Sequence, residues 1–210
     1  MADGYLEKRM EEFSSNSRKS VKKHISLDVL FERNRSHRGY NKDFVVRSDM
    51  LERIVNVNTK IASGKNQQVL RFRLVTKGAD ADFILQNIKL GGMLPELHLP
   101  YEGTEPEAFI IVCSTAAETK IIDIDLGISL QSMALKATEM GLNGLIICAF
   151  NKSGIVEHFK LQYEPLAILA IGKGAENIKL KASSVDESRA YYRVDGVHYV
   201  PKLRLEDIII

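Results

Sequence analysis

The chain contains no tryptophan, only two cysteines, and a formal net charge at pH 7 of only +2. A charge this close to zero does not favour a nucleic-acid-binding protein, and we assign the local basic run 18–24 to an exposed segment. Cys113 and Cys148 lie in apolar segments at no metal-ligand spacing, which predicts free, buried thiols in a reducing cytoplasm and no metal site. No apolar run reaches the roughly 20 residues needed to span a bilayer, and residues 1–10 do not form a signal peptide. We expect a cytoplasmic protein that binds neither membrane nor nucleic acid.

With 45% apolar residues in 210, the chain can bury a full hydrophobic core. Residues 1–25 are polar, and basic in their second half, so we expect an extension there and one domain over residues 26–210. The order of strands and helices predicts an α+β sandwich around one sheet. The hydrophobic pattern predicts helices at 27–33, 48–61, 83–88, 123–140 and 155–159, and strands at 70–74, 109–113, 145–150 and 166–171.

The sequence also predicts the role or packing of two further segments. Residues 91–106 form a long Gly/Pro-containing loop, which is typical of a lid or an arm. Residues 123–140 form a helix that is apolar on more than one face, so it packs either in the core or against a second subunit. The tail after residue 182 is polar until Tyr199 and ends in the segment 205–210, and we assign no helix or strand to it.

The segment from Arg35 to Tyr40 follows the first predicted helix, in which Leu27, Leu30 and Phe31 share a face. Its guanidinium and hydroxyl groups suit a phosphate or the carbonyl-rich edge of a ring. A solvated helix end is the alternative interpretation. Neither a catalytic triad nor a phosphate-binding glycine loop is present, and we place the five histidines at the surface or at helix caps. Hydrogen-bond donors without a nucleophile are typical of an enzyme whose cofactor carries the chemistry.

Four segments, in order, resemble the motifs of the FMN-dependent nitroreductase family. The family's Arg-Arg-Ser-x-Arg-x-Phe is similar to residues 34–40, although Asn34 replaces its first arginine. Its Pro-Ser-x-x-Asn-x-Gln-Pro-Trp-x-Phe resembles residues 62–72, although Val69 and Leu70 replace Pro-Trp. Residues 125–142 resemble its Asp-x-Gly helix, which ends in Gly-Leu. Lys202 matches a basic residue that precedes a Pro-Leu-Glu-like segment.

The resemblance implies a set of cofactor-binding residues. Arg35, Ser36 and Lys202 would bind the FMN phosphate or ribityl chain, and Arg38 would face the N1/O2 edge of the flavin ring. A loop of the partner subunit would approach the same flavin, and one strand end would line the ring near N5, although Cys148 equally suits a small core residue. The full set is Asn34, Arg35, Ser36, Arg38, Ser63, Gly64, Asn66, Gln68, Ile147, Cys148, Ala149 and Lys202, with no catalytic side chain.

The resemblance also implies a three-layer sandwich with a mixed sheet flanked by helices, and a homodimer in which helix 123–140 supplies much of the interface. The implied activity transfers hydride from NADH or NADPH through N5 of FMN to a nitroaromatic, a quinone or a similar small acceptor. Two alternatives remain at this stage. One is a flavin-binding or flavin-sequestering protein without turnover, which the changes at Asn34, Val69 and Leu70 favour. The other is a non-catalytic interaction module that binds a polyanion.

Overall fold

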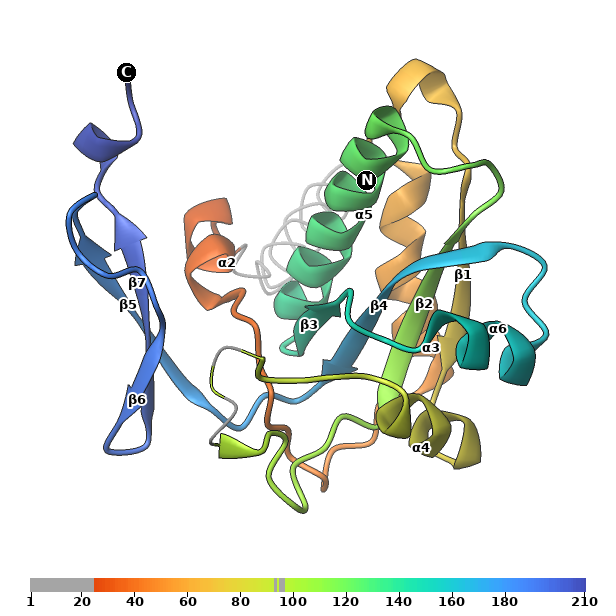
Figure 1. Ribbon diagram of the computed structural model, residues 1–210, viewed down its shortest axis with the longest axis horizontal. Helices are drawn as coiled ribbons and strands as arrows, with labels where there is room; N and C mark the ends of the chain where they lie inside the picture. The colour runs from red at the N-terminus through yellow and green to blue at the C-terminus, as the bar shows by residue number, and fades with distance from the viewer. Residues whose placement is uncertain (1–24, 93, 95–96) are drawn as a thin grey trace, which may run out of the picture.

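The computed structural model describes residues 25–92, 94 and 97–210 (Figure 1). The predicted extension and its basic run, residues 18–24, lie outside the described residues except for Ile25. Among the described residues, no helix has the length and apolar character needed to cross a membrane.

A four-stranded sheet forms the centre of the protein. Its strands are β1 (Leu70–Val75), β2 (Ala108–Ser114), β3 (Asn143–Ile147) and β4 (Glu164–Gly172), in the order β1-β2-β4-β3. All three pairings are antiparallel, so the mixed sheet implied by the resemblance is not found here. Every residue of β2 is buried because its near-continuous apolar sequence packs against helices on both faces.

Helices cover both faces of this sheet and make three layers (Figure 1). Because side chains alternate along a strand, Ile110 and Val112 point to one layer, with α3 (Ser48–Val55) and α5 (Lys120–Glu139). Phe109 and Ile111 point to the other, with α4 (Ala79–Gln86) and α6 (Lys152–Phe159). Each fully buried aliphatic or aromatic side chain stabilises the fold by about 1.5–3 kcal/mol. The three-layer arrangement of helices on a sheet is therefore confirmed.

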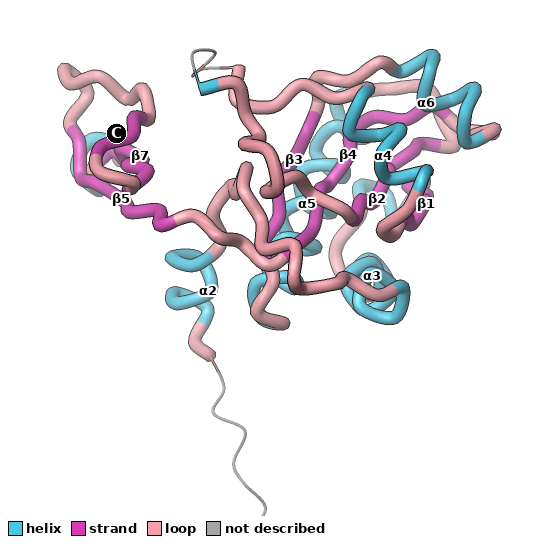
Figure 2. Tube along the Cα trace, turned by 90° about the horizontal axis from the view of Figure 1, so that it is seen from below, coloured by secondary structure: helices cyan, strands magenta, loops and turns pink. Residues whose placement is uncertain are grey.

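A second sheet of three strands follows, and the expectation of a single sheet is wrong. It contains β5 (Asn177–Ser183), β6 (Tyr192–Val194) and β7 (Val197–Leu203), in the order β5-β7-β6. The β5–β7 pairing is parallel and the β6–β7 pairing antiparallel. This C-terminal sheet lies to one side of the three layers in both views (Figures 1 and 2). Few of its residues are buried, so it has no apolar run that would predict strands.

Several local expectations need correction. Helix α2 (Leu27–Arg33) forms as predicted, with Ser26 accepting a hydrogen bond from the amide of Val29, but none of its residues is buried. Helix α3 begins at Ser48, and a 3-10 turn over residues 56–59 ends it well before the predicted boundary. The last predicted strand residues, 148–150, follow β3 rather than extend it. Cys113 is buried, whereas Cys148 is exposed, because it lies beyond the end of the strand.

Candidate functional site

A cavity of about 340 Å³ lies between the three layers and the C-terminal sheet. We call it the arginine pocket. One wall comes from the loop after α2 together with α5 and β3, and the other from β5, β7 and the segment before β6. Its lining residues are Phe31, Asn34, Arg35, Ser36, Arg38, Gln131, Ala134, Gly144, Ile146, Leu169, Ile178, Tyr191, His198, Val200 and Lys202. The fold thus brings together Asn34, Arg35, Ser36, Arg38 and Lys202, although Lys202 is more than 160 residues distant from the others in sequence.

The loop after α2 is fixed by the strands that it crosses. Ser36 forms a parallel bridge with Gly144 of β3, and the amide of His37 donates to the carbonyl of Gly144 at 3.3 Å. Tyr40 forms a second, antiparallel bridge with Gly174, and its hydroxyl donates to the carbonyl of His37 at 2.8 Å. These backbone contacts determine where the side chains of the arginine pocket begin.

Three cationic side chains line the pocket, and among the described residues none that lines it is acidic. The guanidinium of Arg35 donates to the carbonyl of Phe31, but its buried Nε has no partner among the described residues. Burial lowers the pKa of Arg35. The guanidinium of Arg38 lies 4.9 Å from the centre of the Tyr191 ring and donates to the carbonyl of Ser36 at 3.3 Å. A cavity with this charge attracts anions.

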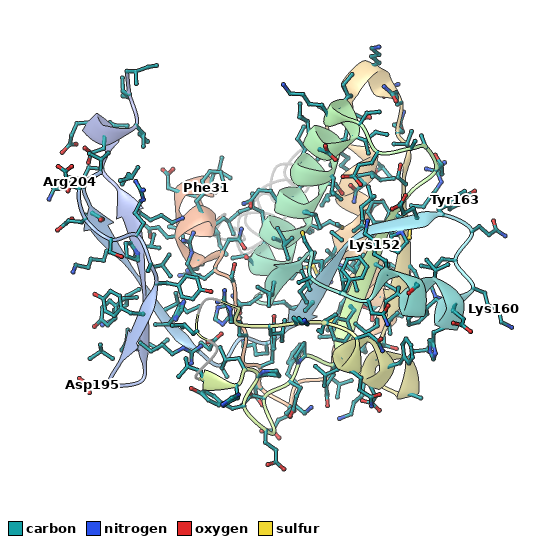
Figure 3. The ribbon with its side chains drawn as sticks, in the orientation of Figure 1. Phe31, Lys152, Lys160, Tyr163, Asp195 and Arg204 are labelled. Carbon is teal, nitrogen blue, oxygen red and sulfur yellow. The ribbon has the colours of Figure 1, made fainter. Side chains whose placement is uncertain are left out.

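Figure 3 shows Phe31, from α2, in the space between the C-terminal sheet and α5. Its side chain is 45% exposed and also lines the arginine pocket. The pocket therefore has an apolar surface beside its cationic groups. This combination suits a ligand that carries both an apolar ring and an anionic group.

One buried histidine, His37, lies in the loop after α2, and another, His198, lies on β7. Their predicted placement at the surface is wrong. His37 is 7% exposed and His198 is 2% exposed. Burial lowers the pKa of both, the cations of Arg38 and its neighbours lower it further, and Glu176 opposes this. Neither Nδ1 atom has a partner among the described residues. Both imidazoles are consequently neutral at pH 7.

The C-terminal sheet contributes Lys202, which the resemblance implied, and three pocket residues that sequence reasoning missed, Ile178, His198 and Val200. His198, Val200 and Lys202 alternate along β7, which places all three on one face of that strand, toward the pocket. Ile178 joins them from β5, where it pairs with His198. The alternation in residues 197–203 is a signal that could have identified this face, although Pro201 is unfavourable inside a strand.

The loop from Ser63 to Gln68 lies in a different place. Ser63 and Gln68 line a second cavity of about 540 Å³, the loop pocket, which α3, β1 and α5 also line. The hydroxyl of Ser63 donates to buried Asp125 at 2.7 Å and accepts from the amide of Gln68 at 3.0 Å. The amide of Gly64 donates to the other oxygen of Asp125 at 2.7 Å. Within one chain, Ser63, Gly64, Asn66 and Gln68 therefore do not join the arginine pocket.

Three residues of this loop adopt the left-handed region. They are Lys65, Asn66 and Gln68, with φ of 52°, 54° and 49°. Such backbone costs of order 1–3 kcal/mol per residue and persists where the surroundings fix it, often at binding sites. Asp125 supplies that fixation, and the side chains of all three residues remain exposed.

The strand-end residues also lie apart from the pocket wall. Ile147 is 3% exposed and packs into the core layer of α4 and α6, whereas its neighbour Ile146 lines the arginine pocket. Cys148 is exposed, and the carbonyl of Ala149 accepts from the amide of Lys89 at 2.9 Å. None of Ile147, Cys148 and Ala149 lines the arginine pocket.

Solved structures with this fold are numerous. A nitroreductase family protein from Clostridium difficile 630 is 24% identical, with a TM-score of 0.57 over 72% of this chain and 86% of that chain. A mutant FMN- and NADPH-dependent nitroreductase from Sphigopyxis sp. strain HMH is 17% identical, with a TM-score of 0.61 over 72% and 89%. A nitroreductase family protein from Streptococcus pneumoniae TIGR4 is 14% identical, with a TM-score of 0.62 over 88% and 99%. These similarities establish the fold.

A search of curated proteins gives no match. The family model described as "Nitroreductase family" matches residues 32–173, more than half of the chain. The matched range includes both cationic loop residues, Arg35 and Arg38, and the whole four-stranded sheet, and it ends before β5. The chain therefore belongs to the nitroreductase family.

Proposed function

We propose that the protein is an FMN-dependent oxidoreductase that takes hydride from NADH or NADPH and reduces a nitroaromatic, a quinone or a similar small acceptor. The observation that carries the proposal is the arginine pocket, where Arg35, Arg38 and Lys202 converge with no acidic lining residue. The FMN- and NADPH-dependent neighbour of the same fold supports the choice of cofactor.

The residues present suit FMN. A cavity of about 340 Å³ falls within the ordinary range for small-molecule sites. The unpartnered Nε of Arg35 is a buried donor that lacks an acceptor, and a phosphate supplies several. Arg35, Ser36 and Lys202 would hold the phosphate and ribityl chain, and Asn34 would add a neutral amide. Phe31, Ile146 and Leu169 offer an apolar surface for the ring system.

The chain's own groups would bind and tune the cofactor rather than react. When bound, FMN accepts a hydride and later donates it to the acceptor. Arg38 would hold a fixed positive charge near the flavin ring. Its guanidinium stacks on the ring of Tyr191. A fixed cation stabilises negative charge that develops next to it, and in a partly buried pocket this stabilisation is stronger than in water. Burial lowers the pKa of His37 and of His198, which disfavours a positive charge on either imidazole and leaves the arginines and Lys202 as the cations of the pocket.

The proposed enzyme is a homodimer. Helix α5 exposes Ile121 and Ile124, which are 37% and 54% exposed, and α2, which contacts α5, exposes Leu27 and Phe31. A side chain added at Gly127, on the same face of α5, would meet no atom within 4 Å. Such apolar exposure on adjacent helices is typical of an interface. In a dimer the loop Ser63–Gln68 of one subunit would complete the arginine pocket of the other.

The first experiment identifies the cofactor. The purified protein should show flavin absorption or bind added FMN at about one per subunit, and Arg35→Ala should weaken FMN binding by about 1.5–3 kcal/mol. Riboflavin lacks the phosphate, so its affinity should change little in Arg35→Ala. Arg47→Ala, which changes an exposed arginine immediately before α3, is the matched control. Equal FMN affinity in wild type and Arg35→Ala would contradict the phosphate assignment.

The second experiment tests turnover and assembly. Reduction of a quinone or nitroaromatic by NADH or NADPH should follow ping-pong kinetics, because both substrates use the same pocket. A yellow protein that oxidises neither nucleotide would instead select the non-catalytic flavin-binding alternative. Sedimentation should give about twice the 23.6 kDa chain mass, and Ile124→Arg should shift it toward the monomer. A monomer with full FMN occupancy would contradict the shared site.

A further inference from the structure

Glu176 occupies the short segment between β4 and β5, where the chain leaves the central sheet for the C-terminal sheet. Its side chain is only 9% exposed. A carboxylate so deeply buried is costly unless charged or hydrogen-bonding groups compensate it. The partners of Glu176 therefore indicate what the residue stabilises.

One oxygen of Glu176 holds the loop of the arginine pocket. Its Oε2 accepts hydrogen bonds from the amide of Arg38 and, at 3.1 Å, from the amide of Gly39. The same oxygen lies 3.9 Å from Nδ1 of His37. Two backbone amides directed at one carboxylate oxygen fix the local backbone, because hydrogen bonds to an ionised acceptor are shorter and stronger than neutral ones. The side chain of Arg38 therefore begins from a fixed position.

The other oxygen holds the C-terminal sheet. Oε1 of Glu176 accepts a hydrogen bond from the guanidinium of Arg193 on β6. Arg193 pairs directly with His198 of β7, the strand that brings His198 and Lys202 to the pocket. The Arg193 side chain is 20% exposed, so water screens this ion pair only in part. A single carboxylate thus joins the strand pair of one wall to the loop of the other.

The charges around Glu176 come from both walls. His37 lies close to it on the loop, and Arg193 and His198 lie near it on the C-terminal sheet. Removal of the carboxylate would leave Arg193 without its counter-charge and the amides of Arg38 and Gly39 without their acceptor. Glu176 does not itself line the arginine pocket, so its effect on a ligand is indirect.

We propose that Glu176 is the positioning residue of the arginine pocket: one oxygen holds the Arg38 loop, the other holds the C-terminal sheet through Arg193, and together they fix the distance between the two walls. The role in wall geometry stands on the contacts alone. Its consequence for FMN affinity rests on the proposed function.

The first test uses hydrogen exchange of the ligand-free full chain, measured by mass spectrometry. Glu176→Gln replaces the carboxylate by a neutral amide, so the loop amides lose their charged acceptor and Arg193 loses its counter-charge. Exchange should become faster by about tenfold or more in the segments 36–40 and 192–203, while β2 and β4 stay protected. Glu206→Gln, an exposed carboxylate after the C-terminal sheet, is the matched control and should change neither segment. Unchanged exchange in either segment of Glu176→Gln would overturn the proposal.

A second variant covers the case in which Glu176→Gln does not fold. Arg193→Gln removes the partner on the C-terminal sheet and leaves the loop amides bonded to Glu176. It should accelerate exchange in 192–203 strongly and in 36–40 weakly. Equal acceleration of exchange in both segments, or none in either, would contradict the proposal that one oxygen of Glu176 holds the loop and the other holds the C-terminal sheet.

The third experiment tests whether the contacts of Glu176 affect ligand binding. It measures the affinity for FMN and the visible circular dichroism of the bound flavin. Glu176→Gln should weaken FMN binding about tenfold and alter the dichroism at saturating FMN, whereas a loss of stability alone would leave the dichroism of the saturated protein unchanged. The double variant with Arg193→Gln should bind no more weakly than Glu176→Gln. Strictly additive losses would overturn the coupling of the walls. A wild type that binds no FMN would refute the proposed function, and the exchange experiment would still decide the role of Glu176.

Discussion

The two sheets of this protein are stabilised by different kinds of interaction. In the four-stranded sheet, β2 is buried along its whole length and β4 is exposed only at Glu164, so hydrophobic packing on both faces stabilises it. In the C-terminal sheet most residues are exposed or half-buried, and charged and aromatic contacts such as the pair of Glu176 with Arg193 connect it to the rest. The arginine pocket lies between them, so it has one wall that is firmly packed and one whose position depends on polar contacts.

The family model matches the first wall and ends before the second. The firmly packed wall thus lies within the matched range, which includes Arg35 and Arg38. The C-terminal sheet adds Tyr191, His198 and Lys202, which lie outside the matched range. We infer that stability belongs mainly to the first region and that ligand recognition needs both.

The largest effect expected from this comparison is on stability, at Ile111 in the centre of β2. Ile111 is fully buried between the sheet and the layer of α4 and α6. Ile111→Ala should lower the free energy of unfolding by about 2–5 kcal/mol, because the lost methylene groups leave a cavity. Denaturant titration followed by circular dichroism measures this change. A loss under about 1 kcal/mol would show that the central sheet is not the principal source of stability.

The next effect is on binding and not on stability, at Lys202 of β7. Lys202→Ala should weaken FMN affinity by about 1.5–3 kcal/mol, the ordinary size for a lost charge-assisted hydrogen bond. The free energy of unfolding should scarcely change, because Lys202 is exposed. Lys179 on β5 is exposed but does not line the arginine pocket, so Lys179→Ala is the matched control. Equal FMN affinities in the two variants would place the phosphate elsewhere.

The free energy of unfolding should depend on pH because of two histidines that lie where the two regions meet. The pKa values of His37 and His198 lie below the ordinary 6.5 in the folded protein, chiefly because burial disfavours the charged imidazole. As the pH falls through 6.5, the unfolded chain takes up protons before the folded protein does, so the free energy of unfolding should decrease. Thermal unfolding from pH 7.5 to 5.5 measures it. The double variant His37→Gln with His198→Gln should show a smaller pH dependence, and an unchanged one would assign the effect to other groups.

The smallest effect is expected at Leu180 of β5, which is 44% exposed. Leu180→Ala should change the free energy of unfolding by no more than about 0.5 kcal/mol, as surface substitutions do. The same denaturant titration that is used for Ile111→Ala gives the value. A loss comparable to that of Ile111→Ala would mean that the C-terminal sheet has a hydrophobic core of its own, and the contrast between the two regions would fail.

Sequence reasoning located the first region well because its physical signals are local. The alternation of Leu70, Phe72 and Leu74 with arginines predicted β1, and the apolar run 109–113 predicted β2. The strands of the C-terminal sheet were missed because they bury few side chains, so hydrophobic periodicity is weak there. Their positions depend on Glu176 and Arg193, which are distant in sequence from the loop that they hold.

The same contrast applies to the candidate site. The motif around Arg35 and Arg38 could be identified because charged donors follow a capped helix. Lys202 could be identified only through the family resemblance. The burial of His37 and His198 could not be predicted, because it results from two segments that pack against each other across more than 150 residues of sequence. Asp125 matched a family motif, but that it holds Ser63 and Gly64 emerges only from the fold.

The bridge between Ser36 and Gly144 has a consequence for solubility. A four-stranded open sheet has two edge strands, here β1 and β3, and an unpaired edge can recruit a strand from another molecule. The loop that carries the arginines crosses the edge of β3 and occupies its carbonyl at Gly144. At the other edge, β1 presents Arg71 and Arg73, whose charges oppose strand addition. The loop of the arginine pocket therefore also covers part of the edge of β3, which opposes edge-to-edge aggregation.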